Sequence, residues 1–124
     1  MPSQDNFTLQ KNKTCTNSRT DCVRQLNDAF RNTLTGGQVM LTSGVRSLGS
    51  QAISDIVAVV RYFSDFSADN DPYGEHDFGS FSHAGHKIIW KIDYYDQSLE
   101  YGSPDPTDPL VTRRVLTIML AAEY

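Results

Sequence analysis

Residues 69–96, DNDPYGEHDFGSFSHAGHKIIWKIDYYD, decide the fold class of this chain. In the second half of the stretch, apolar and aromatic side chains recur at every second residue, the period at which side chains share one face of a β-strand. Ala84-Gly85 interrupts the pattern in the way a tight turn does. The stretch therefore predicts two strands paired as a hairpin. The residues expected to face the core are Ile88, Trp90, Ile92 and Tyr94.

Upstream of the hairpin, apolar residues recur at helical spacing. Residues 20–34 carry an apolar side chain at every third or fourth position, which predicts a helix that ends before Gly36-Gly37. Residues 48–63 repeat this pattern and predict a second helix. Between them, QVMLT at residues 38–42 is rich in β-forming residues and predicts a short strand.

The C-terminal segment predicts a third helix. Asp108 followed by Pro109 is a favourable helix start, and residues 110–122 present a wide apolar face. The expected order is α-β-α-β-β-α, a single α+β domain over residues 19–124. Its sheet would have three or four strands, with the hairpin at the centre and helices packed against it. Residues 1–18 are polar and without period, so we expect a flexible tail.

Charge is distributed unevenly along the chain. Residues 65–108 contain ten Asp and Glu against two Lys, whereas the whole chain has a net charge of −4. Such a segment repels nucleic-acid phosphates, so direct nucleic-acid binding through it is not expected. It favours a protein partner with a basic surface. Solvation of turn-rich loops explains the same acids equally well.

Known catalytic and metal-binding patterns fail in this sequence. Asp69-x-Asp71 begins like a calcium loop, but Tyr73 and Ser80 occupy positions where an EF-hand needs carboxylate or amide ligands. No nucleophile elbow or phosphate-binding loop is present. We therefore expect no cofactor, and a non-enzymatic role is favoured. The alternative is a metal-dependent hydrolase or nuclease-like enzyme that uses Glu75, His76, Asp77, Lys91 and Asp93.

Acids and polar-tipped aromatic rings gather in one part of the sequence, a composition typical of protein interfaces. Arg- or Lys-bearing partners suit such a surface. The predicted binding residues are Asp71, Tyr73, Glu75, His76, Asp77, Lys91, Asp93, Tyr95 and Asp96. A cross-strand salt bridge is the structural alternative for Asp77, Lys91 and Asp93. The apolar face of the predicted helix at residues 110–122 also suggests a homodimer.

The N-terminal part indicates a cytoplasmic protein. No apolar run has the roughly 20 residues of a membrane-spanning helix, and the first residues do not read as a secretory signal. Cys15 and Cys22 are spaced neither as a redox pair nor as a zinc site. Reduced thiols are expected in the cytosol, while a disulfide requires the intervening segment to fold back.

Several motifs together resemble one family. They are LNDAFR at residues 26–31, LTSGV at 41–45, NDPYGEHDFGSF at 70–81, WKIDYYD at 90–96 and VTRRVLTIMLAAEY at 111–124. The chain is similar to a small bacterial domain of unknown function found in proteobacterial chromosomes and plasmids. The resemblance implies a cytosolic protein from genomes rich in mobile elements, and it brings no known activity. It suggests an interaction module that inhibits a host defence nuclease of the CRISPR or restriction type.

Overall fold

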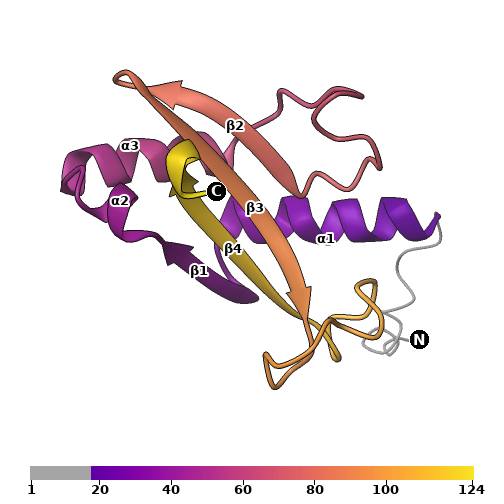
Figure 1. Cartoon of the computed structure of the whole chain (residues 1–124). Helices are drawn as coiled ribbons and strands as arrows, with labels where there is room; N and C mark the ends of the chain where they lie inside the picture. Colours follow the sequence, from indigo (N-terminus) through magenta and orange to yellow (C-terminus); the bar gives the residue numbers. More distant parts are fainter. Residues whose placement is uncertain (1–17) are drawn as a thin grey trace, which may run out of the picture.

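The computed structural model describes residues 18–124 and contains a four-stranded sheet in the order β1-β4-β3-β2 (Figure 1). β1 runs parallel to β4, and the other neighbouring strands are antiparallel. The elements are α1 (Arg19–Thr33), β1 (Gly37–Leu41), α2 (Ser43–Arg46), α3 (Ser50–Arg61), β2 (Phe78–His83), β3 (His86–Tyr95), β4 (Arg113–Leu120) and the 3₁₀ turn η3 (Ala121–Glu123). The predicted α+β class is confirmed, but the expected order α-β-α-β-β-α is matched only in part. The hairpin of β2 and β3 lies at one edge of the four-stranded sheet and not at its centre, because β4 pairs with β3 on one side and with β1 on the other.

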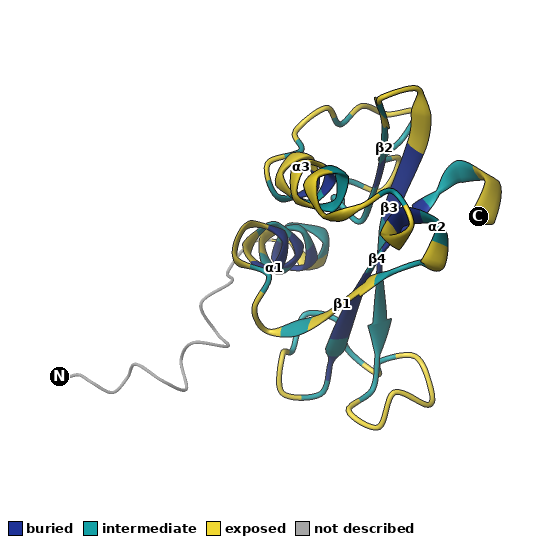
Figure 2. Cartoon of the chain, turned by 90° about the vertical axis from the view of Figure 1, so that its left-hand side faces the viewer, coloured by how far each residue is buried: buried dark blue, intermediate teal, exposed yellow. Residues whose placement is uncertain are grey.

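Helices α1 and α3 pack on one face of the sheet, and the core lies between them and the strands (Figure 2). Trp90 is at its centre and is fully buried, with the rings of Phe63 and Phe66 against it. The two predicted helices at residues 20–34 and 48–63 are thereby confirmed, with small shifts at their ends. The short helix α2 after β1 had no counterpart in the sequence analysis.

The predicted hairpin and the position of its turn are confirmed. His83 pairs with His86, and both turn residues between them, Ala84 and Gly85, have positive φ. Two positive φ angles in a two-residue turn match the right-handed twist of the flanking strands. A Cβ atom at Gly79 would overlap the indole of Trp90, so a glycine at this position makes room for the tryptophan ring.

The prediction of a helix over residues 110–122 is wrong, because this segment forms strand β4. β4 lies between β1 and β3, and side chains are buried on both of its faces. Leu116 and Ile118 belong to the core under the helices, while Val115 and Met119 are buried on the opposite face. A strand covered on both sides reads as a continuous apolar run, which resembles the wide apolar face of a helix.

The expected helix start at Asp108 is a turn. The Asp108 carboxylate accepts a hydrogen bond from the Leu110 amide, as Asp does when it closes a short loop on itself. Residues 110–122 therefore have no helical face, and the homodimer expected through it stays a prediction without that support. β4 instead uses these apolar side chains inside its own domain.

Two predictions about the N-terminus lie outside the described residues. The flexible tail is predicted for residues 1–18, of which only Ser18 is described. The Ser18 hydroxyl oxygen caps α1 by accepting a hydrogen bond from the Asp21 amide. The pairing of the two cysteines involves Cys15, which is also outside this range. A membrane-spanning helix is absent from residues 18–124.

Candidate functional site

Helix α1 carries a stripe of polar residues beside its apolar stripe. Arg24, Asn27, Asp28 and Arg31 are separated by three, one and three residues, so they line one side of the helix. All four contact the long loop of residues 62–77, which connects α3 to β2. We call this segment the 62–77 loop. It contains five of the nine predicted binding residues.

The polar residues of α1 hydrogen-bond to the backbone of the 62–77 loop. Arg24 Nη1 donates to the carbonyl of Gly74 at 2.9 Å, and Asn27 Nδ2 donates to the carbonyl of Glu75 at 2.9 Å. Arg31 Nη1 donates to the carbonyl of Phe63 at 3.1 Å. Three points along the loop are therefore fixed to one rigid helix.

His76 is the side chain through which the loop binds α1 most directly. Its Nδ1 lies 2.9 Å from Asp28 Oδ1, and its Nε2 lies 3.6 Å from Asp71 Oδ2. The ring stacks on Phe66 with centroids 3.8 Å apart and planes inclined by 5°. His76 has a φ of 55°, a conformation that non-glycine residues adopt only when surrounding contacts hold them there.

Arg31 lies under the loop and is 3% exposed. Its guanidinium donates to Asp28 Oδ1 at 2.9 Å and to the Val60 carbonyl at 2.8 Å, and it lies 4.8 Å from the ring centroid of Trp90. Burial lowers the pKa of Arg31, and the Asp28 carboxylate opposes this shift. Arg31 remains a cation there because its pKa starts far above neutrality.

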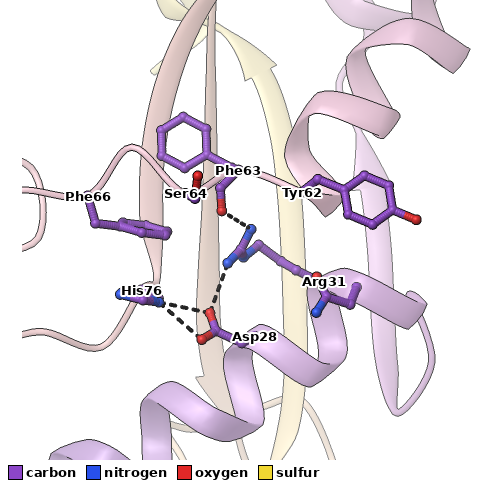
Figure 3. Close-up of a pocket in the computed structure, with 8 residues that line it drawn as sticks. Asp28, Arg31, Tyr62, Phe63, Ser64, Phe66 and His76 are labelled. Atoms are coloured by element: carbon purple, nitrogen blue, oxygen red, sulfur yellow. Dashed lines mark hydrogen bonds and ion pairs between the residues drawn. The ribbon is translucent and has the colours of Figure 1, made fainter.

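An open hollow of about 510 Å³ lies where these groups meet (Figure 3). Figure 3 shows the Asp28 carboxylate between the guanidinium of Arg31 and the ring of His76. The lining residues are Asp28, Arg31, Asn32, Tyr62, Phe63, Ser64, Phe66 and His76. Both nitrogens of His76 face carboxylates, and no hydroxyl in residues 18–124 bonds to either one. The Asp28–His76 pair therefore lacks the nucleophile that a catalytic triad needs.

A second polar network lies deeper, between α1 and the sheet. Asn27 is fully buried, donates to Tyr94 Oη at 2.8 Å and accepts from Arg114 Nε at 2.7 Å. The Tyr94 hydroxyl in turn donates to Glu75 Oε1 at 2.8 Å. Burial raises the pKa of Tyr94, so its hydroxyl keeps its proton and remains a donor. Four of the motif segments that carried the family resemblance thus meet at one point.

Asp77 is half-buried and makes no ion pair with any residue in 18–124. Burial raises the pKa of its carboxyl, and the negative charges of Glu75, Asp71 and Asp93 raise it further. Its carbonyl accepts from the Ile92 amide, so extending the strand register places Asp77 on the helix-covered face.

Lys91 and Asp93 lie on the other face of the sheet and form an ion pair with N and O 2.9 Å apart. Asp77 therefore does not form the cross-strand salt bridge considered for it, because residue 77 pairs with 92 and its side chain lies on the opposite face from Lys91 and Asp93. Tyr95 lies on the same outer face as Lys91. No group of three or more His, Cys, Asp or Glu in residues 18–124 is arranged to hold a metal ion.

The remaining two predicted binding residues lie in different surroundings. Asp96 closes the turn after β3, where its carboxylate accepts from Ser98 Oγ and from the Glu100 amide. Tyr73 is 80% exposed near the tip of the 62–77 loop. The nine residues are thus divided between the loop with its supporting helix, the outer face of the sheet and the turn after β3.

Sequence reasoning missed the part of the site that α1 contributes. Asn27 and Arg31 fall on the buried side of the helix, in register with Val23 and Phe30. Two polar side chains within a predicted apolar stripe were the available signal, because buried polar groups need partners. The partners of Asn27 are 48, 67 and 87 residues away along the chain, and two of those of Arg31 are 29 and 32 residues away, so nothing local indicates them.

Comparison with protein families gave one match, to the family described as "Protein of unknown function (DUF3768)", over residues 41–123. Comparison with curated proteins and with solved structures gave no match. The matched range includes the 62–77 loop and strands β2, β3 and β4. It covers more than half of the chain, and the chain therefore belongs to the DUF3768 family of proteins of unknown function.

Proposed function

We propose that this protein is an interaction module that binds a basic surface of another protein through the 62–77 loop. The observation that carries the proposal is that Tyr73, 80% exposed, projects from a loop whose backbone α1 fixes from below. Exposed tyrosines on fixed loops are efficient contact residues, since they bury a large area and lose little side-chain entropy.

Fixing the loop in advance favours binding. A mobile loop of this length would lose conformational entropy on association, at about 1 kcal/mol or more for each residue that becomes ordered. The contacts of Gly74, Glu75 and His76 to α1 already restrict the neighbours of Tyr73 in the free protein. The loop therefore loses its conformational entropy when the protein folds, and little of this loss remains to oppose binding of the partner.

Charge determines the kind of partner. The 62–77 loop contains five Asp and Glu and no Lys or Arg. The side chain of Asp71 is only 6% exposed, and that of Glu75 accepts a hydrogen bond from Tyr94. These two acids therefore act on a partner mainly through their electrostatic field and not through direct contact. Asp65 and Asp69 are exposed and are available for direct contacts. Such a field attracts Arg- and Lys-rich surfaces and accelerates their association.

A narrower form of the proposal names the partner as a host defence nuclease of the CRISPR or restriction type. A nucleic-acid groove is basic, and an acidic loop with an aromatic tip is suited to occupy it. The resemblance to domains from genomes rich in mobile elements supports this choice. To test it, the rate of DNA cleavage by purified defence nucleases is measured while increasing amounts of the protein are added. The narrower form predicts that the rate falls. Unchanged cleavage by all of them would eliminate the narrower form alone.

The general proposal is tested with a matched pair of variants. Tyr73→Ala removes the loop tip, whereas Tyr101→Ala removes a tyrosine of similar exposure, 71%, from the loop after β3. Wild-type protein and both variants are immobilised and incubated with a bacterial lysate, and the retained proteins are quantified. We expect specific partners to be retained by the wild type and by Tyr101→Ala and lost with Tyr73→Ala. Equal retention by all three would refute a role for the loop.

The hydrolase alternative has less support. Glu75 is bonded to Tyr94 and His76 to Asp28, while Lys91 and Asp93 pair on the opposite face of the sheet. The five residues therefore do not converge on a common point where a metal ion and a substrate would meet.

A further inference from the structure

The edge of the sheet formed by β1 is open and unprotected. β4 is the only strand next to β1 within residues 18–124, and no described element lies beyond it in Figure 1. Its central residues are exposed, including Val39 at 37% and Met40 at 54%. Edge strands are normally protected by charges, proline or a bulge, and GQVML has neither charge nor proline.

The direction of each backbone group along β1 follows from one hydrogen bond. The Thr42 amide donates to the Ile118 carbonyl of β4 at 3.1 Å. Because these groups alternate along a strand, Gln38 and Met40 also direct their N–H and C=O groups toward β4. Gly37, Val39 and Leu41 direct theirs outward, to the open edge.

We propose that β1 pairs with β1 of a second copy of this chain, antiparallel and around a two-fold axis at Val39. In this register Val39 lies opposite the same residue of the second copy, and Gly37 lies opposite Leu41. These are the three outward-directed residues, so every outward N–H and C=O gains a partner. The two four-stranded sheets become one of eight strands.

Side chains and charge support a second copy as the occupant. The large Leu41 lies opposite Gly37, which has no side chain to oppose it. No charged residue of β1 faces its own copy. The strand order places β1 at the edge of the sheet opposite to β2, which follows the acidic 62–77 loop. Pairing through β1 therefore keeps the two most acidic regions at the far ends of the assembly, where their repulsion is weakest.

The test is sedimentation equilibrium of the full chain up to about 500 µM, where a pairing with a millimolar Kd is already visible. Val39→Lys and Val39→Glu each place like charges opposite one another at the axis. Val59→Lys is the control, since Val59 on α3 is 40% exposed and lies outside the interface. We expect a concentration-dependent dimer for the wild type and Val59→Lys and monomers for each Val39 variant. An equimolar mixture of the two Val39 variants should restore the dimer by opposite charges.

Circular dichroism verifies that the variants are folded, and hydrogen exchange supplies a measurement on the wild type itself. The Val39 amide should exchange more slowly as protein concentration rises, because it becomes hydrogen-bonded only in the dimer. A wild-type chain that remains monomeric, or a dimer that persists in Val39→Lys, overturns the proposal. A mixture of the Val39 variants that stays monomeric overturns the register.

Discussion

Replacing Asn27 by alanine should destabilise the protein by about 3 to 5 kcal/mol. Asn27 is fully buried, and its side chain joins α1 to the Glu75 carbonyl, to the Tyr94 hydroxyl and to Arg114. Each of the two neutral hydrogen bonds contributes about 1 kcal/mol. Arg114 is also buried, and depriving a buried guanidinium of an acceptor costs about 1.5 to 3 kcal/mol.

The assay is urea unfolding followed by the fluorescence of Trp90, the single tryptophan, which is fully buried in the core. Asn32→Ala is the control, because Asn32 is on the same helix and exposed, and we expect it to change stability by less than about 0.5 kcal/mol. The midpoint should fall for Asn27→Ala with an unchanged slope. A loss below about 1 kcal/mol would show that this network is not what joins α1 to the sheet and the loop.

Three further predictions concern other parts of the fold. Asp77→Asn should stabilise the protein at pH 7. Burial and the charge of Glu75 raise the pKa of Asp77 in the folded state above its value in the unfolded state. The folded state therefore binds this proton more tightly than the unfolded state and loses stability as pH rises through the raised pKa. Thermal melts should show the gain at pH 7 and its disappearance below the pKa of the unfolded state. Glu123→Gln should flatten the acid side of the stability profile. The Thr42 hydroxyl chiefly lowers the pKa of Glu123, so this carboxylate stabilises the fold above about pH 4.5 and the stabilisation is lost as pH falls further, as melts from pH 7 to pH 3 will show. Gly79→Ala should lower stability by about 1 to 3 kcal/mol, because the added methyl overlaps the indole, and a shifted tryptophan emission should accompany the loss.

The proposed function and the proposed dimer are independent. The proposed interaction site lies on the 62–77 loop, and the proposed pairing edge lies on β1 at the other side of the sheet. A dimer formed through β1 would carry two binding loops at opposite ends, which raises the avidity for a partner with repeated basic sites. Val39→Lys should leave binding by a single loop intact, whereas Tyr73→Ala should leave the dimer intact.

The sequence indicated the loop that we propose as the binding site, but not the helix that supports it. Acids and aromatic rings in residues 69–77 indicated a recognition segment, and Tyr73 is indeed exposed. Asp77 does not join the ion pair of Lys91 and Asp93, because residue 77 lies opposite residue 92 and its side chain is on the other face of the sheet. A change of one residue in the register moves a side chain to the opposite face of the sheet. The sequence around Asp77 does not determine that register, because Asp77 precedes the first residue of β2.

Local sequence by itself determined the hairpin and the two long helices. Alternation around Trp90, a turn at Ala84-Gly85 and helical spacing are short-range patterns that each act within a few residues. Only the tertiary structure decided that residues 113–120 form a strand, since an apolar run of this length suits a buried helix or a buried strand equally well. The segment forms a strand because it lies between β1 and β3, which supply backbone hydrogen-bond partners on both of its sides. The same holds for Asn27, whose buried amide is bonded by partners that folding brings from distant parts of the chain, and for Arg31, which bonds the distant Val60 carbonyl in addition to its helix neighbour Asp28.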